Sequence, residues 1–300
     1  MHIDPYIVLG GAIVGLLVGM TGAGGGALMT PMLILLFGVA PTAAISSDLV
    51  ASVVMRPIGA SVHLRARTVH RRLVILMASG SVPAAVLGSY LLSRLGHARS
   101  DVREIELILG LALLAGSAAM VVRYALDRRA GGERDEQLHE LTPRPFVTVL
   151  IGILGGLMVG MTSVGAGSLM VVLLLFIYPS ISAKQLVGTD LTQAVPLTLA
   201  AAIGSLLFGH VEFGLTGSLI LGSVPAVFLG SLLSSSVPDR YIRPVIAFVI
   251  LASGLKYVGL GPVVLGWTLV VVLLLGAGFV THELRSGRER ATERSSRVLH

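Results

Sequence analysis

The sequence predicts an all-α integral membrane protein made of two similar halves, and three observations support this. Hydrophobic residues make up 54% of the 300 residues. Charged residues make up only 13%, against the ~25% typical of soluble domains. The mean hydropathy is +0.88, and the charges separate apolar stretches of the ~20 residues that a helix needs to cross a bilayer. Finally, several motifs occur twice.

Eight or nine hydrophobic segments follow one another along the chain, and the first and fifth are longer than one crossing requires. The segments lie at about 6–38, 44–64, 73–92, 104–125, 146–178, 185–208, 213–234, 241–259 and 262–281. The predicted organisation is a first repeat at 6–126, a polar cytoplasmic linker at 127–143, a second repeat at 144–260, an extra hydrophobic segment at 261–281 and a charged cytoplasmic tail at 282–300.

The duplication involves three blocks of residues in register. The glycine-rich run 15–29 aligns with 156–170 at an offset of 141 residues. Ser47-Asp48-Leu49 aligns with Thr189-Asp190-Leu191, and the Gly-Ser-Val-Pro-Ala block at 80–84 recurs at 222–226, both at an offset of 142. Such a match predicts an internal structural repeat.

The distribution of Lys and Arg predicts that the two repeats are inverted in the membrane. If all nine segments cross, the loop charges divide into ten and eleven. If segments one and five instead enter and return at their glycines, seventeen charges lie on one side and four on the other, with Arg56 inside the membrane. The positive-inside rule favours the second arrangement, which places the linker and the tail in the cytoplasm.

The glycine clusters in segments one and five are the first candidate site. Glycine permits the backbone angles that break a helix, and a half-helix that restarts after a break directs free N–H groups and a positive dipole end at a ligand. Two such ends near the bilayer midplane would bind an anion. The alternative is close helix packing through small residues. The candidate residues are Thr21, Gly22, Gly24, Gly25 and Gly26, with Thr162, Ser163, Gly165 and Gly167.

Arg56 is the one basic residue deep within an apolar segment. A mid-bilayer Arg costs at least ~2.5–3.5 kcal/mol, so it must face the protein interior and have a partner. The functional interpretation is a guanidinium that binds an oxyanion. The alternative is a structural pair with Asp48 or with a backbone carbonyl beside Pro57. The second repeat has Thr198 at the matching position.

Asp48 and Asp190 are the duplicated acids, and two interpretations apply to them. Either acid is a possible proton-coupling site. Both also follow a hydroxyl residue near the expected start of a helix, where a carboxylate caps free N–H groups. We favour the capping interpretation at this stage.

The glycine runs at 15–26 and 156–167 and the Gly-Ser-Val-Pro blocks resemble the TauE/SafE sulfite-exporter family, also called the toluene-sulfonate uptake permease family. The resemblance covers about residues 6–260. It implies a multi-pass plasma-membrane transporter with duplicated halves that handles sulfite, sulfonates or related sulfur oxyanions. The second run departs from the pattern at Ser163, Val164 and Ala166, so the halves are not expected to contribute equally to a site.

We therefore expect a transporter that exports a small sulfur oxyanion, because a cytoplasm-negative potential favours anion exit. Proton-coupled uptake of a related anion and a non-transporting assembly or sensor subunit are the alternatives. An enzyme is not expected, because the sequence has no HExxH and no GxSxG motif. The expected partners are the anion and the lipid bilayer, without nucleic acid, cofactor or metal, and the oligomeric state stays open.

Overall fold

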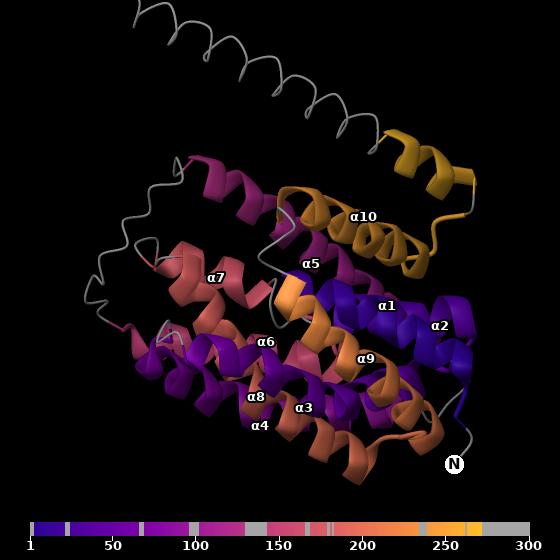
Figure 1. The fold of residues 1–300 in the computed structure, drawn as a ribbon, viewed down its shortest axis with the longest axis horizontal. Coiled ribbons are helices and arrows are strands. Elements are labelled where there is room, and N and C mark those ends of the chain that lie inside the picture. The colour runs from indigo at the N-terminus through magenta and orange to yellow at the C-terminus, as the bar shows by residue number, and fades with distance from the viewer. Residues whose placement is uncertain are drawn as a thin grey trace, which may run out of the picture. The chain divides into compact units, whose positions relative to one another are not determined.

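The structure is a computed structural model, and it describes residues 3–21, 25–65, 69–95, 102–129, 143–165, 169–178, 181, 183–233, 239–261 and 263–271. Within these residues every regular element is a helix, which confirms the all-α prediction. The ten long helices are α1 (Pro5–Thr21), α2 (Gly26–Phe37), α3 (Pro41–Arg65), α4 (Arg71–Leu95), α5 (Val102–Arg129), α6 (Pro145–Thr162), α7 (Leu169–Ile177), α8 (Ala183–Phe208), α9 (Phe213–Leu233) and α10 (Asp239–Tyr257) (Figure 1).

Residues Met1–Val258 form one compact unit, which holds the first predicted repeat and all but the last two residues of the second, and Gly259–His300 form another unit. In the second unit residues 263–271 are helical, whereas residues 272–281 of the predicted extra segment and the predicted tail lie outside the described residues. The first three residues of the predicted linker continue α5 to Arg129. Most of the remaining linker also lies outside the described residues.

Five helical stretches are long and apolar enough to cross a membrane. They are Arg71–Leu95, Val102–Val122, Pro145–Thr162, Gln185–Phe208 and Phe213–Leu233. Shorter apolar helices are found at Pro5–Met20, Gly26–Phe37 and Ile246–Tyr257. The chain is thus a multi-pass helical membrane protein, and the count of eight or nine segments stays a prediction.

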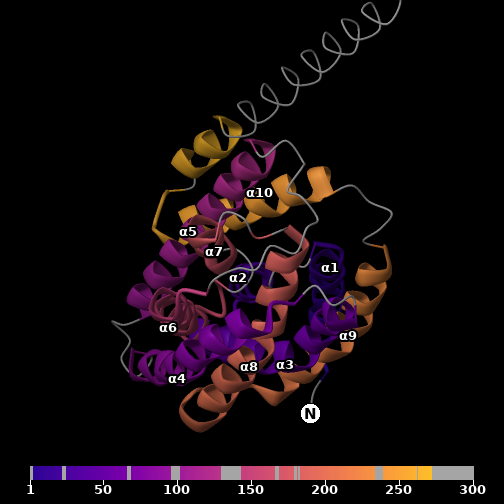
Figure 2. The same ribbon diagram turned by 90° about the vertical axis from the view of Figure 1, so that its left-hand side faces the viewer.

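Two helix pairs make the most extensive contacts, α1 with α9 and α4 with α6. Both pairs lie side by side in the two views of the ribbon (Figures 1 and 2). Glycines allow this approach: a Cβ on Gly15 would collide with the backbone of Ser223, and one on Gly156 with the backbone of Ser81. Because the Gly-Ser-Val-Pro blocks contribute Ser81 and Ser223, these blocks pack against the two glycine runs.

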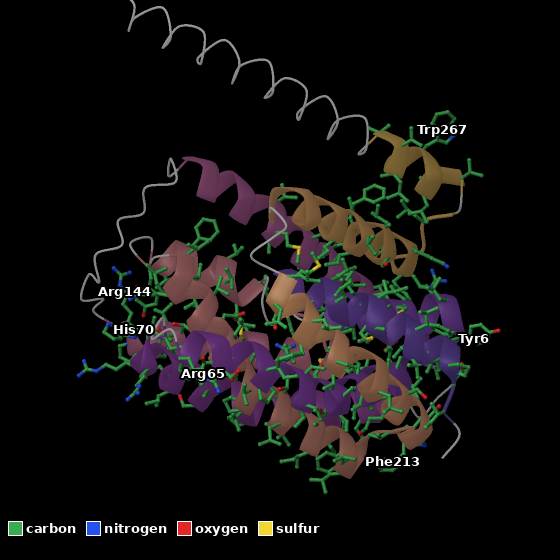
Figure 3. All side chains as sticks on the ribbon, in the orientation of Figure 1. Tyr6, Arg65, His70, Arg144, Phe213 and Trp267 are labelled. Carbon is green, nitrogen blue, oxygen red and sulfur yellow. The ribbon has the colours of Figure 1, made fainter. Side chains whose placement is uncertain are left out.

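The connections between helices place matched turns at opposite ends of this unit. Arg65, His70 and Arg144 lie together at one end, and Tyr6 and Phe213 lie at the other (Figure 3). The α3–α4 turn therefore lies at the first end and the α8–α9 turn at the second.

Hydrogen bonds also join the two ends of the predicted fifth segment. The backbone N–H of Arg144, just before α6, donates to the hydroxyl of Tyr178, just after α7, at 2.7 Å. The chain from α6 to α7 thus returns to the end from which it started.

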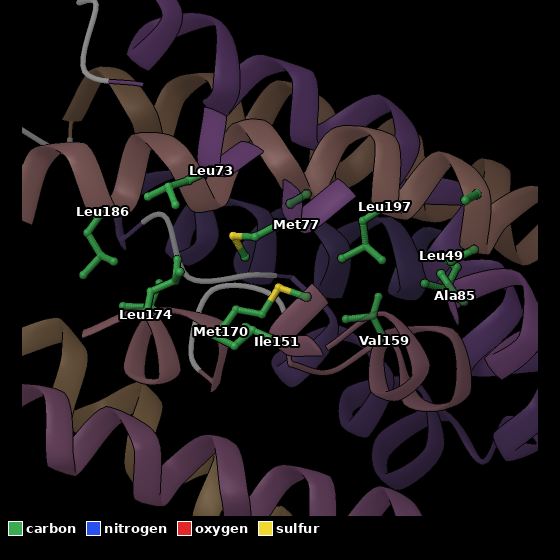
Figure 4. Packing of buried hydrophobic residues seen from close by; sticks show 14 of the residues in the cluster. Leu49, Leu73, Met77, Ala85, Ile151, Val159, Met170, Leu174, Leu186 and Leu197 are labelled. Carbon is green, nitrogen blue, oxygen red and sulfur yellow. The ribbon is translucent and has the colours of Figure 1, made fainter. Parts of the chain in front are cut away.

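The apolar interior of this unit is built between helices from both predicted repeats. One cluster joins Leu49 of α3 and Met77 of α4 to Met170 of α7 and Leu197 of α8 (Figure 4). A second cluster is centred on α2, with Met29 and Leu33 fully buried. Both halves of a broken segment are therefore held by apolar packing, which leaves the residues of the breaks available for polar contacts.

Candidate functional site

Both long segments are broken where their glycines predict a break. The first helix ends at Thr21 and α2 begins at Gly26, with Gly25 as its N-cap residue. In the second segment α6 ends at Thr162, and Ser163 and Gly165 have φ angles of 59° and 123° before α7 begins. Positive φ angles are strained for residues with a side chain, so Gly165 is suited to its position and Ser163 is an exception.

The two breaks contact each other. Gly26 lies against the backbone carbonyl of Ser163 so closely that any side chain at position 26 would overlap it. Thr162 stabilises the second break, because its hydroxyl donates to the carbonyl of Met158 at 2.7 Å and accepts from the N–H of Val164 at 3.2 Å. The first N–H groups of α2, which have no partner within that helix, are thus placed at the junction of the two breaks.

Asp48 links this junction to α3. Its carboxylate is fully buried, and the Oδ2 atom accepts hydrogen bonds from Thr30 of α2 at 2.9 Å and from Ser163 at 2.8 Å. The Oδ1 atom is also buried and has no hydrogen-bond partner among the described residues. One carboxylate therefore holds both broken segments and keeps a second oxygen available.

Arg56 lies on the same helix as Asp48, eight residues further on, with only 8% of its surface exposed. Its Nε and Nη2 groups are buried and have no hydrogen-bond partner among the described residues. The guanidinium interacts electrostatically with Asp190 and, more weakly, with Asp48. Whether Arg56 forms a structural pair with Asp48 or binds a ligand therefore stays a prediction.

Asp190 and Gln193 are polar residues on one face of α8, which packs against α3. Both are buried, Asp190 at 2% exposure and Gln193 at 0%. The amide nitrogen of Gln193 donates to Ser81 of α4 at 2.6 Å, and its Oε1 atom is buried without a partner among the described residues.

The capping interpretation of the two acids is wrong. Helix α3 begins at Pro41 and α8 at Ala183, so Asp48 and Asp190 lie beyond the first helical turn of each. The free N–H groups that a cap would bind belong to the first turn. Their neighbours Ser47 and Thr189 instead accept from the backbone N–H groups of Glu212, just before α9, and His70, just before α4, at 3.2 Å and 3.0 Å.

The structure brings together Gly25, Gly26, Thr162, Ser163 and Asp48 among the predicted site residues. Gly22, Gly24 and Gly167 lie outside the described residues, and Thr21 is the last residue of α1. Sequence analysis missed Thr30, whose one signal was a hydroxyl residue within an apolar run, directly before Pro31.

A family model described as "Sulfite exporter TauE/SafE" matches residues 7–257 of the chain. The chain is also similar to two proteins of Bacillus subtilis (strain 168). It is 39% identical to the probable membrane transporter protein YjnA over 253 residues, which are 84% of this chain and 98% of the relative. It is 24% identical to the probable membrane transporter protein YdhB over 214 residues, 70% of this chain and 81% of the relative. No solved structure matches the chain.

Proposed function

Because the chain belongs to the sulfite exporter TauE/SafE family of membrane transporters, we propose that it carries a small sulfur oxyanion, sulfite or an organosulfonate, out of the cell across the plasma membrane. The single observation that supports an anion as cargo is Arg56, a buried guanidinium with two N–H groups that have no partner among the described residues. A buried donor without a partner is costly. A guanidinium forms strong paired hydrogen bonds to oxyanions, so a bound sulfite or sulfonate would satisfy both groups.

The broken helices support the same site. The N-terminal end of α2 lies at the junction with Ser163, and half-helix ends of this kind bind anions in transporters with inverted repeats. We propose that the substrate-binding residues are Arg56 with the described glycines and hydroxyls of the two breaks. Gly22, Gly24 and Gly167 belong to the same proposal from sequence alone.

The proposed membrane arrangement is a pair of inverted repeats, 6–126 and 144–260, with the linker 127–143 and the tail 282–300 in the cytoplasm. The matched turns at opposite ends and the matched glycine contacts of α1–α9 and α6–α4 support it. The chain has no cysteine, so single-cysteine labelling is a direct test. We expect Ala40→Cys and Ser180→Cys to be labelled from opposite sides of the membrane. Labelling of both from the same side would exclude inversion.

The outward direction rests on the membrane potential. A cytoplasm-negative potential favours the exit of each negative charge by ~2.3 kcal/mol per 100 mV. The buried acids Asp48 and Asp190 favour a second candidate function, proton-coupled uptake of a related anion, because an ionisable residue inside a membrane protein commonly transfers protons.

The proposed function is tested by flux into liposomes that contain the purified chain. Sulfite, sulfate, thiosulfate and methanesulfonate are screened, and the Arg56→Gln variant is compared with Arg65→Gln, which removes an exposed charge from the end of the same helix. A hydrogen bond to a charged group contributes about 1.5–3 kcal/mol. Its loss in Arg56→Gln should therefore weaken the substrate affinity roughly 10- to 100-fold. Arg65→Gln should transport normally. Equal flux in both folded variants would remove Arg56 from the site.

A further inference from the structure

We propose that Asp48 takes up a proton when the anion binds, so that its carboxyl group becomes a second hydrogen-bond donor to the anion opposite Arg56. This inference rests on the anion site proposed above and adds a proton to the transported or bound species.

The formal charge of the site favours protonation of Asp48 when an anion binds. Among the described buried residues, Asp48, Arg56 and Asp190 are the three that carry a formal charge. Asp48 and Arg56 balance each other when both are charged, and a bound monoanion would give this pair a net charge of −1 inside a protein interior. Burying unbalanced charge is strongly unfavourable, and a buried acid commonly avoids this by binding a proton.

The hydrogen-bond partners of Asp48 leave its Oδ1 atom as the oxygen that can take up the proton. Both hydroxyl donors, Thr30 and Ser163, bind the Oδ2 atom, and Oδ1 is buried without a partner among the described residues. A proton on Oδ1 leaves both existing hydrogen bonds in place. It also converts an acceptor that repels an anion into an O–H group that donates to one.

The spacing of Asp48 and Arg56 along α3 leaves room for an anion between their side chains. Asp48 and Arg56 are eight residues apart on α3, which separates their Cα atoms by about 12 Å along the axis at 1.5 Å per residue. Helical side chains lean toward the N-terminus, and the guanidinium of Arg56 interacts electrostatically with Asp48 across that gap. An oxyanion between them would accept from Arg56 on one side and from protonated Asp48 on the other.

The groups that face Asp48 leave few other places for this proton. Thr30 of α2 and Ser163 do not titrate in the relevant range, and Arg56 stays charged. Asp190 on α8 interacts with the same guanidinium and is the competing proton acceptor. Glu212, whose N–H is bound by Ser47 beside Asp48, is exposed to solvent.

The proposed proton changes the charge that moves with each substrate. A dianion such as sulfite would cross with a net charge of −1, and the membrane potential would still favour its exit. A monoanionic sulfonate would cross with no net charge, and the gradients of anion and proton alone would set its direction.

The test is isothermal titration calorimetry of the purified full chain with methanesulfonate and with sulfite. Measurements in Tris and in triethanolamine, which differ in protonation enthalpy, give the number of protons taken up, and the protonation of sulfite itself is subtracted. Sulfonate and phosphate buffers are avoided because they are oxyanions. We expect the wild type to take up about one proton per anion, with Kd falling by up to tenfold for each unit decrease in pH until Asp48 is protonated beforehand.

The Asp48→Asn variant should bind the anion with no proton uptake and with a Kd that does not depend on pH. Anion binding to the wild type with no proton uptake and a constant Kd would overturn the proposal, a result that does not depend on the variant being folded. Proton uptake that persists in Asp48→Asn but is lost in Asp190→Asn would overturn the assignment to Asp48. Failure of both anions to bind the wild type would instead contradict the anion site itself.

Discussion

At matched positions the first broken segment carries Gly22, Thr30 and Phe37, whereas the second carries Ser163, Val171 and Tyr178. Both segments are broken and share the glycines at 24 and 26, which match 165 and 167, but they carry their hydroxyl groups at different positions. Thr30 from one half and Ser163 from the other both bind the carboxylate of Asp48. The matched residues that would serve Asp190 in the same way, Gly22 and Val171, have no hydroxyl group. The difference teaches that the duplicated scaffold is asymmetric at these positions, because the two hydroxyl contacts of Asp48 are not offered to Asp190 by the matched residues.

The same asymmetry applies to charge. Arg56 of α3 matches Thr198 of α8, whose hydroxyl donates to the carbonyl of Ala194 in its own helix at 2.7 Å. Among the described buried residues, Arg56 is therefore the one cation beside two matched acids, and it lies on the helix that carries Asp48. A site with one cation suits one anion at a time.

The largest expected effect comes from filling the contact between the breaks. Gly26→Ala places a Cβ inside the backbone of Ser163 and forces the two segments apart. We expect a loss of about 3 kcal/mol or more in the free energy of unfolding, at the upper end of overpacking effects. Thermal or denaturant unfolding of the purified protein in detergent measures it.

Gly25→Ala is the matched control for that substitution. A Cβ on Gly25 would meet Met55 at 3.6 Å and Val18 at 3.9 Å, which are ordinary contacts, and its φ of −56° suits alanine. The change in stability should stay within about 1 kcal/mol. Equal destabilisation by the two substitutions would show that the breaks do not depend on contact between Gly26 and Ser163.

The second prediction concerns Thr30, the residue of α2 that donates a hydrogen bond to Asp48. Thr30→Val introduces the side chain that the second half carries at position 171 and removes one donor from Oδ2. Loss of a buried hydrogen bond to a charged group should cost about 1.5–3 kcal/mol of unfolding free energy.

Thr198→Val, which removes a hydroxyl bonded only to its own helix, should cost less than about 1 kcal/mol. Urea unfolding of both variants, followed by circular dichroism, compares them. A cost for Thr198→Val as large as for Thr30→Val would mean that the bond to Asp48 does not stabilise the fold.

The positions of the two breaks and the burial of Arg56 were predictable from the sequence for a clear physical reason. Glycine clusters inside an over-long apolar run, and a guanidinium at mid-bilayer depth, are unfavourable unless the fold uses them. The helices that pack against the broken segments were not predictable. A face of small residues indicates close packing, but it does not indicate which helix packs there. The contacts of Gly15 with Ser223 and of Gly156 with Ser81 appear only in three dimensions.

The role of Asp48 was misjudged because of where its helix begins. The apolar pattern starts at about residue 44, so a hydroxyl and an acid at 47 and 48 resemble a cap. The helix instead begins at Pro41, and proline is favoured in the first turn. Thr30 was missed for a different reason. Within an apolar run a threonine that binds another helix looks the same as Thr198, which binds its own backbone.

The smallest expected effect concerns the end of the second segment. The hydroxyl of Tyr178 accepts from the N–H of Arg144 at 2.7 Å and shares a hydrogen bond with Thr148 at 2.6 Å, which ties the end of α7 to the start of α6. Tyr178→Phe introduces the residue that the first half carries as Phe37. Loss of these neutral hydrogen bonds should lower the unfolding free energy by about 1 kcal/mol.

Tyr90→Phe is the control, because the hydroxyl of Tyr90 accepts from Arg94 at an exposed position and water replaces that bond. Its effect on the unfolding midpoint in the same detergent should be close to zero. If Tyr178→Phe is equally harmless, apolar packing closes the second segment without help from these hydrogen bonds. The two broken segments would then be closed in the same way at their ends, and the difference between their hydroxyl contacts would lie at Asp48.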